Sequence, residues 1–220
     1  MRRAKKKQRE PVTRELALAK AMTLADEEGL EALSMRRLAQ ALGVEAMSLY
    51  HHVQNKDEIL DGMVDLVFAE MELPRPDDDW KQGVRRRCHS ARAVLKRHRW
   101  ALGVMESRTT PGPHNLTHHD AMLGCFLRAG FSLPLTGHAY AAIDAFVYGF
   151  VHSELQLPFE TGPEAQAVAK GIFEAMPEGQ FTSLKTFTLK HVLQPGYSFG
   201  DEFEFGLELI LEGLERLRSR

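Results

Sequence analysis

Residues 34–56 read SMRRLAQALGVEAMSLYHHVQNK, and this stretch decides the fold of the N-terminal part of the chain. Ser34 is a good N-cap, and the apolar residues after it recur at helical spacing, which predicts a helix of about two turns over residues 34–42. Gly43 takes a positive φ without steric cost, and a second apolar set that includes Leu49 follows it. The pattern predicts two short helices joined by a tight corner, with Leu49 packing the second helix against the first.

Such a corner is the arrangement of a DNA-binding helix-turn-helix, although a glycine between two short apolar helices is by itself more typical of an ordinary helical corner. The longer run LAQALGVEAMSLYHHVQNKDEIL favours the first interpretation. It resembles the N-terminal domain of the tetracycline-repressor (TetR) family of bacterial transcription regulators, whose pattern is LA..LGV, then S/T-L-Y-x-H-V, then x-N-K-x-x-L. The matching side chains after the corner include Tyr50, His52, Asn55 and Lys56.

The composition is that of a globular protein, with 220 residues, 44 % apolar content and a net charge of −2. The length allows one or two domains. No apolar run approaches the roughly 20 residues that span a bilayer, and the basic start lacks the apolar segment of a secretory signal. We therefore expect a cytoplasmic protein that does not contact membranes and is associated with the nucleoid when bound to DNA. Cys88 and Cys125 match no metal spacing and are expected to be reduced packing residues.

The charges are unevenly distributed along the chain. Residues 1–56 contain eleven Lys and Arg against seven Asp and Glu, whereas the remainder contains seventeen against twenty-three. Because a positive segment attracts phosphates, we assign the DNA face to the N-terminal part. Residues 1–10, MRRAKKKQRE, are expected to form a disordered arm. This arm either has no role or adds contacts to phosphates or to the adjacent minor groove.

Helical periodicity continues through the chain, so we predict an all-α protein. The expected parts are the arm at 1–10, a three-helix helix-turn-helix DNA-binding domain at 11–55, a connecting helix at 56–73, and a larger helical ligand-binding and dimerisation domain at 74–220. The segments PRPDDD (residues 74–79) and TTPGP (residues 109–113) are expected to be breaks between helices. The expected helices cover approximately 13–28, 34–42, 45–51, 56–71, 79–98, 100–107, 116–129, 134–156, 164–176, 181–193 and 201–218.

A short recognition helix offers only its outward side chains to the bases. If Leu49 faces inward, the outward residues are Ala46, Met47, Ser48, Tyr50 and His51. The resemblance implies that bases are faced by Arg36, Arg37, Ala46, Met47, Ser48 and His51. It also implies that phosphates are held by Ser34, Tyr50, His52 and Lys56. Arg36 has the fork to grip a guanine, and Ala46, which replaces a longer polar residue of some relatives, is expected to contact a thymine methyl together with Met47.

Two segments are more apolar than one small domain can cover. Residues 134–156 are apolar on most sides and should be buried all round, and residues 201–218 carry apolar side chains at alternating spacings of four and three. We expect these two helices to form a four-helix interface with a second copy of the chain, which the resemblance also implies. The expected interface residues are Phe146, Phe150, Phe203, Leu207, Ile210, Leu214 and Leu217.

Bulky and polar side chains interleave in the middle of the larger domain, in a pattern typical of a mostly apolar pocket. They are Trp100, Met105, Met122, Phe126, Tyr140, Asp144, Tyr148 and His152. Core packing explains any one of them equally well, but the resemblance implies a ligand cavity for the set. The positions that hold magnesium-binding His and Glu in tetracycline-binding relatives fall at Met105 and Ser153. We therefore expect an unknown small-molecule effector other than magnesium-tetracycline, with no metal and no cofactor.

Other chemistry has weaker support. A metal site at His114 and His118 competes with an exposed polar helix start, which Pro113 favours. The arginines at 85–87 are expected on a solvated helix flank rather than at DNA. No HExxH motif or glycine-rich phosphate loop occurs, so no catalytic residue is predicted. We expect a ligand-responsive homodimeric repressor that binds a palindromic double-stranded operator. The alternatives are an activator, a constitutive repressor without ligand, and a small-molecule or metal-dependent enzyme.

Overall fold

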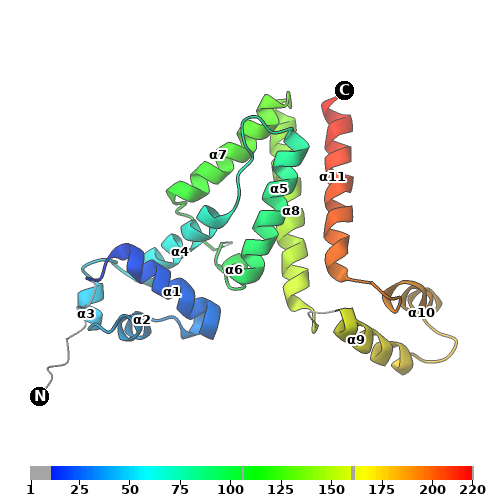
Figure 1. Cartoon of the computed structure of the whole chain (residues 1–220), viewed down its shortest axis with the longest axis horizontal. Helices are drawn as coiled ribbons and strands as arrows, with labels where there is room; N and C mark the ends of the chain where they lie inside the picture. Colours follow the sequence, from blue (N-terminus) through cyan, green and yellow to red (C-terminus); the bar gives the residue numbers. More distant parts are fainter. Residues whose placement is uncertain (1–10, 106, 160–161, 220) are drawn as a thin grey trace, which may run out of the picture. The chain divides into compact units, whose positions relative to one another are not determined.

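The structure is a computed structural model that describes residues 11–105, 107–159 and 162–219, and within these ranges the chain is all-helical, as predicted (Figure 1). Short 3₁₀ turns at Leu30–Ala32 and Phe199–Asp201 and a π-helical turn at Thr188–Val192 add to the helices. The predicted N-terminal arm lies outside the described residues. The helices are α1 (Arg14–Glu28), α2 (Met35–Leu42), α3 (Ala46–Leu49), α4 (Lys56–Glu70), α5 (Trp80–Arg97), α6 (Ala101–Met105), α7 (Pro113–Arg128), α8 (Leu133–Gln156), α9 (Gly162–Ala175), α10 (Thr182–Phe187) and α11 (Glu202–Arg218).

The chain forms two compact units. The first contains the residues up to Leu73 together with Ala93–Ala121, and the second contains Pro74–Arg92 and the residues from Met122 onward. This division differs from the expected boundary at residue 74, because α6 and the start of α7 pack with α4 in the first unit. The sequence break at PRPDDD ends α4 but does not end the first unit.

The start of α4 is fixed by two side-chain hydrogen bonds that resemble a capping box. The Asn55 side chain accepts a hydrogen bond from the Glu58 amide at 2.8 Å, and the Glu58 carboxylate accepts one from the Gln54 amide, also at 2.8 Å. Farther along α4, a Cβ at Gly62 would lie 2.7 Å from the Leu18 side chain. The absence of a side chain there therefore lets α1 approach α4 closely.

The start of α7 is held by an aspartate of α4. The Asp65 carboxylate accepts a hydrogen bond from the Asn115 amide at 2.9 Å, and a Cβ at Gly112 would collide with this carboxylate. This contact explains why α7 begins at Pro113, three residues before the sequence predicted. An exposed polar helix start is correct for His114 but wrong for His118, which is fully buried in the core of the first unit.

The core of the second unit lies between α8 and α11. Val147 and Val151 of α8 and Phe203 and Leu207 of α11 are all inaccessible to solvent. A Cβ at Gly206 would lie 2.6 Å from the Phe146 ring, so the glycine permits that aromatic ring to pack directly on the backbone of α11. Figure 1 shows the two helices side by side.

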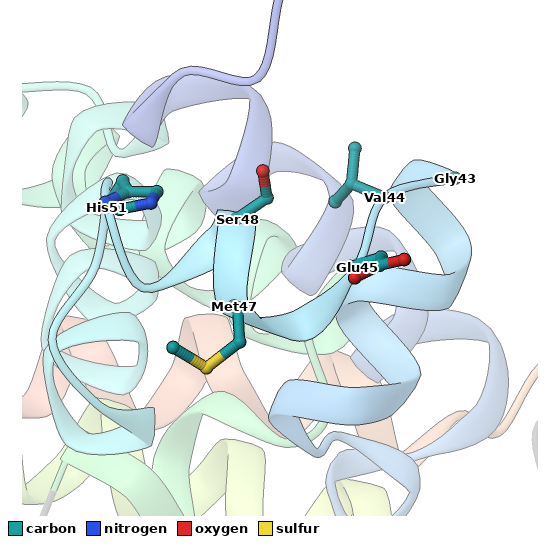
Figure 2. A pocket seen from close by; sticks show the side chains of 6 residues that line it. All are labelled: Gly43, Val44, Glu45, Met47, Ser48 and His51. Carbon is teal, nitrogen blue, oxygen red and sulfur yellow. The ribbon is translucent and has the colours of Figure 1, made fainter.

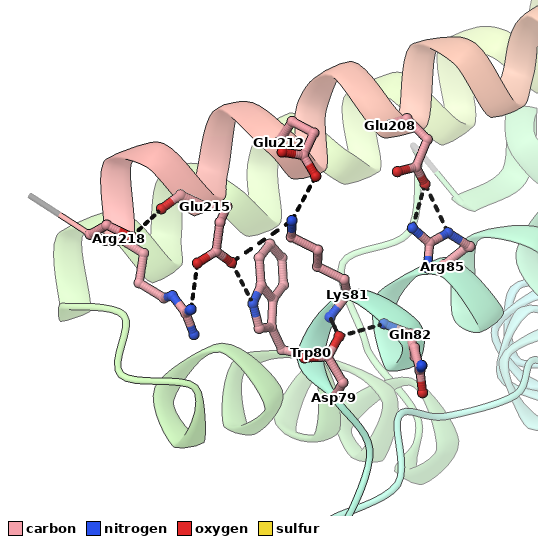
Figure 3. Close-up of polar contacts among 10 residues, drawn as sticks. Asp79, Trp80, Lys81, Gln82, Arg85, Glu208, Glu212, Glu215 and Arg218 are labelled. Carbon is pink, nitrogen blue, oxygen red and sulfur yellow. Dashed lines mark hydrogen bonds and ion pairs between the residues drawn. The ribbon is translucent and has the colours of Figure 1, made fainter.

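A row of polar contacts joins the start of α5 to α11 (Figure 3). Its partners on α11 are glutamates three or four residues apart, which places them on one helix face. The contacts are Trp80 Nε1 with Glu215 (3.1 Å), Lys81 Nζ with Glu212 (2.7 Å) and Arg85 Nε with Glu208 (2.8 Å). Arg85 thus faces α11, and Arg86 pairs with Asp78. The solvated flank predicted for these arginines is therefore wrong.

The prediction of a solvated side chain fails most clearly for Arg87, whose side chain is completely buried. Its Nη2 lies 2.7 Å from the Asp144 carboxylate of α8, and it donates a longer hydrogen bond of 3.4 Å to the Tyr148 hydroxyl. Burial alone would lower the pKa of Arg87, but Asp144 together with Tyr148, Cys88 and Tyr140 outweighs burial, so the pKa is raised. Burial also raises the pKa of Tyr148 to about 12. The cluster therefore holds one ion pair inside the unit.

Asp144→Asn is expected to destabilise the second unit by about 3 kcal/mol, because it leaves the Arg87 charge buried without its counter-ion. The control is Glu208→Gln, which breaks the more exposed pair with Arg85 and should cost less than about 1 kcal/mol. Urea unfolding of both variants measures the difference. Equal losses would contradict the assignment of Arg87 and Asp144 as a buried pair.

Candidate nucleic-acid interface

The interface begins with the ends of α2, which the local sequence sets. The Ser34 hydroxyl accepts a hydrogen bond from the Arg37 amide at 3.2 Å, as expected of an N-cap. At the other end Gly43 adopts the left-handed conformation, with φ 70° and ψ 30°, and the Val44 amide bonds to the Ala39 carbonyl at 3.0 Å. The chain therefore changes direction at Gly43 and enters α3 with the Ala39 and Gln40 carbonyls of α2 hydrogen-bonded.

The corner is closed by apolar packing beneath it. Leu38 and Leu49 are completely buried, and Ala39 and Val53 are nearly so. The α3 helix is a single turn, shorter than the predicted 45–51, and a hydrogen-bonded turn follows it, in which the Leu49 carbonyl accepts a hydrogen bond from the Val53 amide at 3.1 Å. Burial of one face of α3 leaves the opposite face in solvent.

The exposed face of α3 carries the side chains that the sequence assigned to DNA. Met47 is 72 % exposed and Tyr50 is 45 % exposed, although both are large and partly apolar. The residues around the corner, which are labelled in Figure 2, border an open hollow of about 600 Å³. Its lining residues are Gly43, Val44, Glu45, Met47, Ser48 and His51.

The remaining predicted DNA contacts also lie at the surface of the first unit. Arg36, His52 and Lys56 are exposed, and Ser34 is exposed while it caps α2. Ala46 is only half-buried, so its methyl group remains accessible. The assignment of these residues to bases or to phosphates stays a prediction.

Arg37 differs from the other predicted base contacts because it is already paired within the unit. Its Nε donates to the Glu28 carboxylate at the end of α1, at 3.3 Å, and this hydrogen bond raises the pKa of Arg37. Contact with a base requires the guanidinium to leave Glu28. Arg36 carries no such restraint in the described structure and is the better placed of the two arginines.

The residues predicted to line an effector pocket divide between the units. Trp100 and Met105 belong to the first unit, where the Trp100 indole donates to Asp26 at 2.7 Å. The others belong to the second unit. Met122 and Phe126 are fully buried there, and Phe126 packs against Trp80 with ring centroids 6.0 Å apart.

Three predicted pocket residues of α8 share one polar cluster. Asp144 and Tyr148 contact the buried Arg87, and burial together with the nearby Asp144 raises the pKa of Tyr140. His152 faces solvent instead. The sequence did not identify Arg87. The signal for it was the apolar spacing of its helix, because position 87 lies three residues after Val84 and four before Ala91, on the face that these buried residues share.

Most of the residues predicted at the dimer interface are buried or half-buried within the chain itself. Phe203, Leu207 and Leu214 are buried within the chain, because they form the contact of α11 with its own unit. Phe146 and Phe150 are half-buried and stack around Phe203, with centroids 5.4 Å and 5.1 Å from it. The three buried residues are therefore internal contacts, which corrects the prediction for them, whereas the place of Phe146 and Phe150 in a dimer stays a prediction.

Leu217 is 49 % exposed and Ile210 is half-buried, so these two predicted dimer residues remain accessible. The exposed side of α11 also carries Phe205 and Leu209, which were not predicted. The small residues of α8 at Ala141 and neighbouring positions are exposed, which agrees with the expectation that one chain does not cover this helix completely.

No group of three or more His, Cys, Asp or Glu side chains able to hold a metal is found among the described residues. Cys88 and Cys125 are buried and unpaired with one another, as expected. No helix in the described part of the chain is long and apolar enough to cross a membrane.

Two family models match the chain. The model described as "Bacterial regulatory proteins, tetR family" matches residues 17–63, and the model described as "Tetracyclin repressor-like, C-terminal domain" matches residues 73–218. The chain belongs to the TetR family. It is therefore a transcription regulator with a helix-turn-helix DNA-binding domain, as predicted, and not an enzyme.

Similar proteins within the family include repressors and a ligand complex. The chain is 33 % identical to the transcriptional repressor DrrR1 of Streptomyces coeruleorubidus, over 90 % of this chain and 75 % of that one. It is 32 % identical to the class C tetracycline repressor protein of Escherichia coli, over 93 % and 91 % of the two chains. The crystal structure of Streptomyces coelicolor ActR in complex with actinorhodin is similar with a TM-score of 0.78 and 29 % identity, covering 96 % of this chain and 100 % of ActR.

Gly43→Ala is expected to destabilise the first unit by about 1 to 2 kcal/mol, because a Cβ is strained at this left-handed position even though no atom lies within 4 Å of it. Gly43→Asn is the matched control and should cost less, because asparagine adopts this conformation more readily. Thermal or urea unfolding measures both. An alanine variant as stable as the wild type would show that the corner does not depend on its left-handed residue.

Proposed function

We propose that the protein is a homodimeric repressor that binds a palindromic operator and is released from it by a small-molecule effector, within the cytoplasm. The observation that carries the proposal is the exposed face of α3, held outward by the buried side chains of Leu38 and Leu49. In a dimer the two recognition helices enter successive major grooves roughly 34 to 36 Å apart. The operator half-sites then share the two-fold symmetry of the protein.

The dimer surface proposed here combines α8 and α11 of the second unit. The exposed side of α11 presents Phe205 and Leu209, which are 65 % and 60 % exposed, together with Leu217. The exposed side of α8 presents small residues, among them Ala141 and Ala145. Large apolar side chains opposite small ones favour close helix packing.

Leu209→Glu is expected to shift the protein from dimer to monomer, because it places a charge in the apolar surface of α11. Leu127→Glu is the control, since Leu127 is a comparably exposed leucine on α7 of the same unit. Sedimentation equilibrium distinguishes the two states. A Leu209→Glu variant that remains a dimer would remove α11 from the proposed interface.

The effector is proposed to bind in the second unit, where the apolar residues Met122 and Phe126 and the polar cluster of Tyr140, Asp144 and Tyr148 occur. ActR in complex with actinorhodin supports a small-molecule effector, because that structure is similar to this chain over its length. A ligand releases DNA only if it binds better to the conformation that cannot span two half-sites. The absence of the relatives' His and Glu pair at Met105 and Ser153 continues to favour an effector other than magnesium-tetracycline.

The experiment that tests the function is selection of bound duplexes from a random DNA pool, followed by a screen for compounds that reverse binding. The expected result is a two-fold symmetric site and at least one compound that releases it. Failure to enrich any sequence would contradict a DNA-binding regulator of this design. A symmetric site that no compound releases would favour a constitutive repressor.

Arg36→Ala is expected to weaken binding to the selected operator by about 1 to 3 kcal/mol and to relax the preference at one base pair of each half-site. Lys56→Ala, at the start of α4, should weaken binding to all sequences alike and reduce its salt dependence, because a phosphate contact carries no base information. Titrations of operator and scrambled duplexes at two salt concentrations separate these effects. A base-specific loss in Lys56→Ala would reverse the assignment.

A further inference from the structure

Glu45 is an acidic residue on the surface that the proposed function gives to DNA. It is exposed and lines the same hollow as Met47, Ser48 and His51 (Figure 2). Phosphates repel a carboxylate at such a surface, so this residue weakens binding unless its carboxylate accepts a hydrogen bond from the DNA. The question is what the carboxylate of Glu45 contacts.

A role in folding does not explain Glu45. The residue occupies the N-cap position of α3, where a side-chain oxygen can accept an amide hydrogen bond, but its side chain caps no amide of that helix. Among the described residues, no hydrogen bond or ion pair joins its carboxylate to another side chain. The structure of the first unit therefore leaves the acceptor oxygens of Glu45 available to a ligand.

The position of Glu45 restricts what that ligand can be. Recognition helices of helix-turn-helix proteins contact base edges with their N-terminal residues, and Glu45 lies where the chain enters α3 (Figure 2). The major groove offers few hydrogen-bond donors to an acceptor-only group. The principal ones are the amino groups of cytosine and adenine, and a carboxylate is the usual partner of the cytosine N4 amino group.

We propose that Glu45 is a specificity-determining residue that accepts a hydrogen bond from the N4 amino group of one cytosine in each operator half-site. The inference rests on the proposed function, since it presupposes that α3 enters the major groove. Glu45 would then be an acidic base-contacting residue beside the apolar residues Ala46 and Met47. The carboxylate lowers affinity for DNA in general and restores it only at sequences that supply the cytosine.

The test is selection of DNA from the same random pool by the wild type, Glu45→Ala and Glu45→Gln. The wild type is expected to enrich cytosine at one position of each half-site. Glu45→Ala should lose this preference by about tenfold at that position, while its binding to random DNA becomes stronger. Glu45→Gln should shift the preference toward adenine, because a glutamine amide pairs with adenine N6 and N7.

Glu31→Gln is the matched control, because Glu31 is an exposed glutamate of the same unit outside the α2–α3 corner. It removes the same charge and should leave every base preference unchanged. All variants should unfold at the wild-type urea concentration. A wild type that selects no site overturns both this proposal and the proposed function. A wild type that selects a symmetric site, with Glu45→Ala selecting the identical sequence or with Glu45 governing a position other than cytosine, overturns this proposal alone.

Discussion

The left-handed corner at Gly43 and the apolar packing beneath it are the constraint on which the DNA-reading face depends. Leu38 and Leu49 are inaccessible to solvent, and their burial fixes which face of α3 packs on the protein and which face is exposed. This matters because a helix of one turn has little stability of its own. The buried contact therefore determines the direction in which each exposed side chain of α3 points.

The same burial separates the side chains that serve the fold from those available to a ligand. Met47 remains exposed despite its apolar side chain, and Glu45 remains exposed without capping the helix that it precedes. Arg37, in contrast, is engaged by Glu28 of α1. The reading face is therefore a small set of unengaged groups on a rigid base, which suits recognition without reorganisation of the protein.

Local sequence signals predicted the first unit well because its structure depends on local interactions. The N-cap at Ser34, the glycine corner and the N-cap at Asn55 each use partners within five residues. The second unit depends on contacts distant in sequence, and there prediction failed in definite ways. The periodicity of α11 was recognised, but the side occupied by Phe203 and Leu207 was assigned to a partner chain when it packs on α8. Periodicity defines the faces of a helix but not which face has which neighbour.

Arg87 shows a further limit of sequence reasoning. Within a run of three arginines it resembled a solvated charge, and only its counter-ion on α8, 57 residues later in the chain, makes its burial tolerable. Asp144 and Tyr148 were predicted as pocket residues, but the Arg87 guanidinium that both of them contact was not. A buried charge is identified by its partner, and the partner is found only when the helices are placed in space.

Two copies of the α3 reading face are proposed to bind one operator together. Hydroxyl-radical footprinting of the protein on its selected duplex tests this arrangement. Two protected patches are expected on one face of the DNA, with centres one helical turn, roughly 34 to 36 Å, apart. A single protected patch at saturating protein would contradict it.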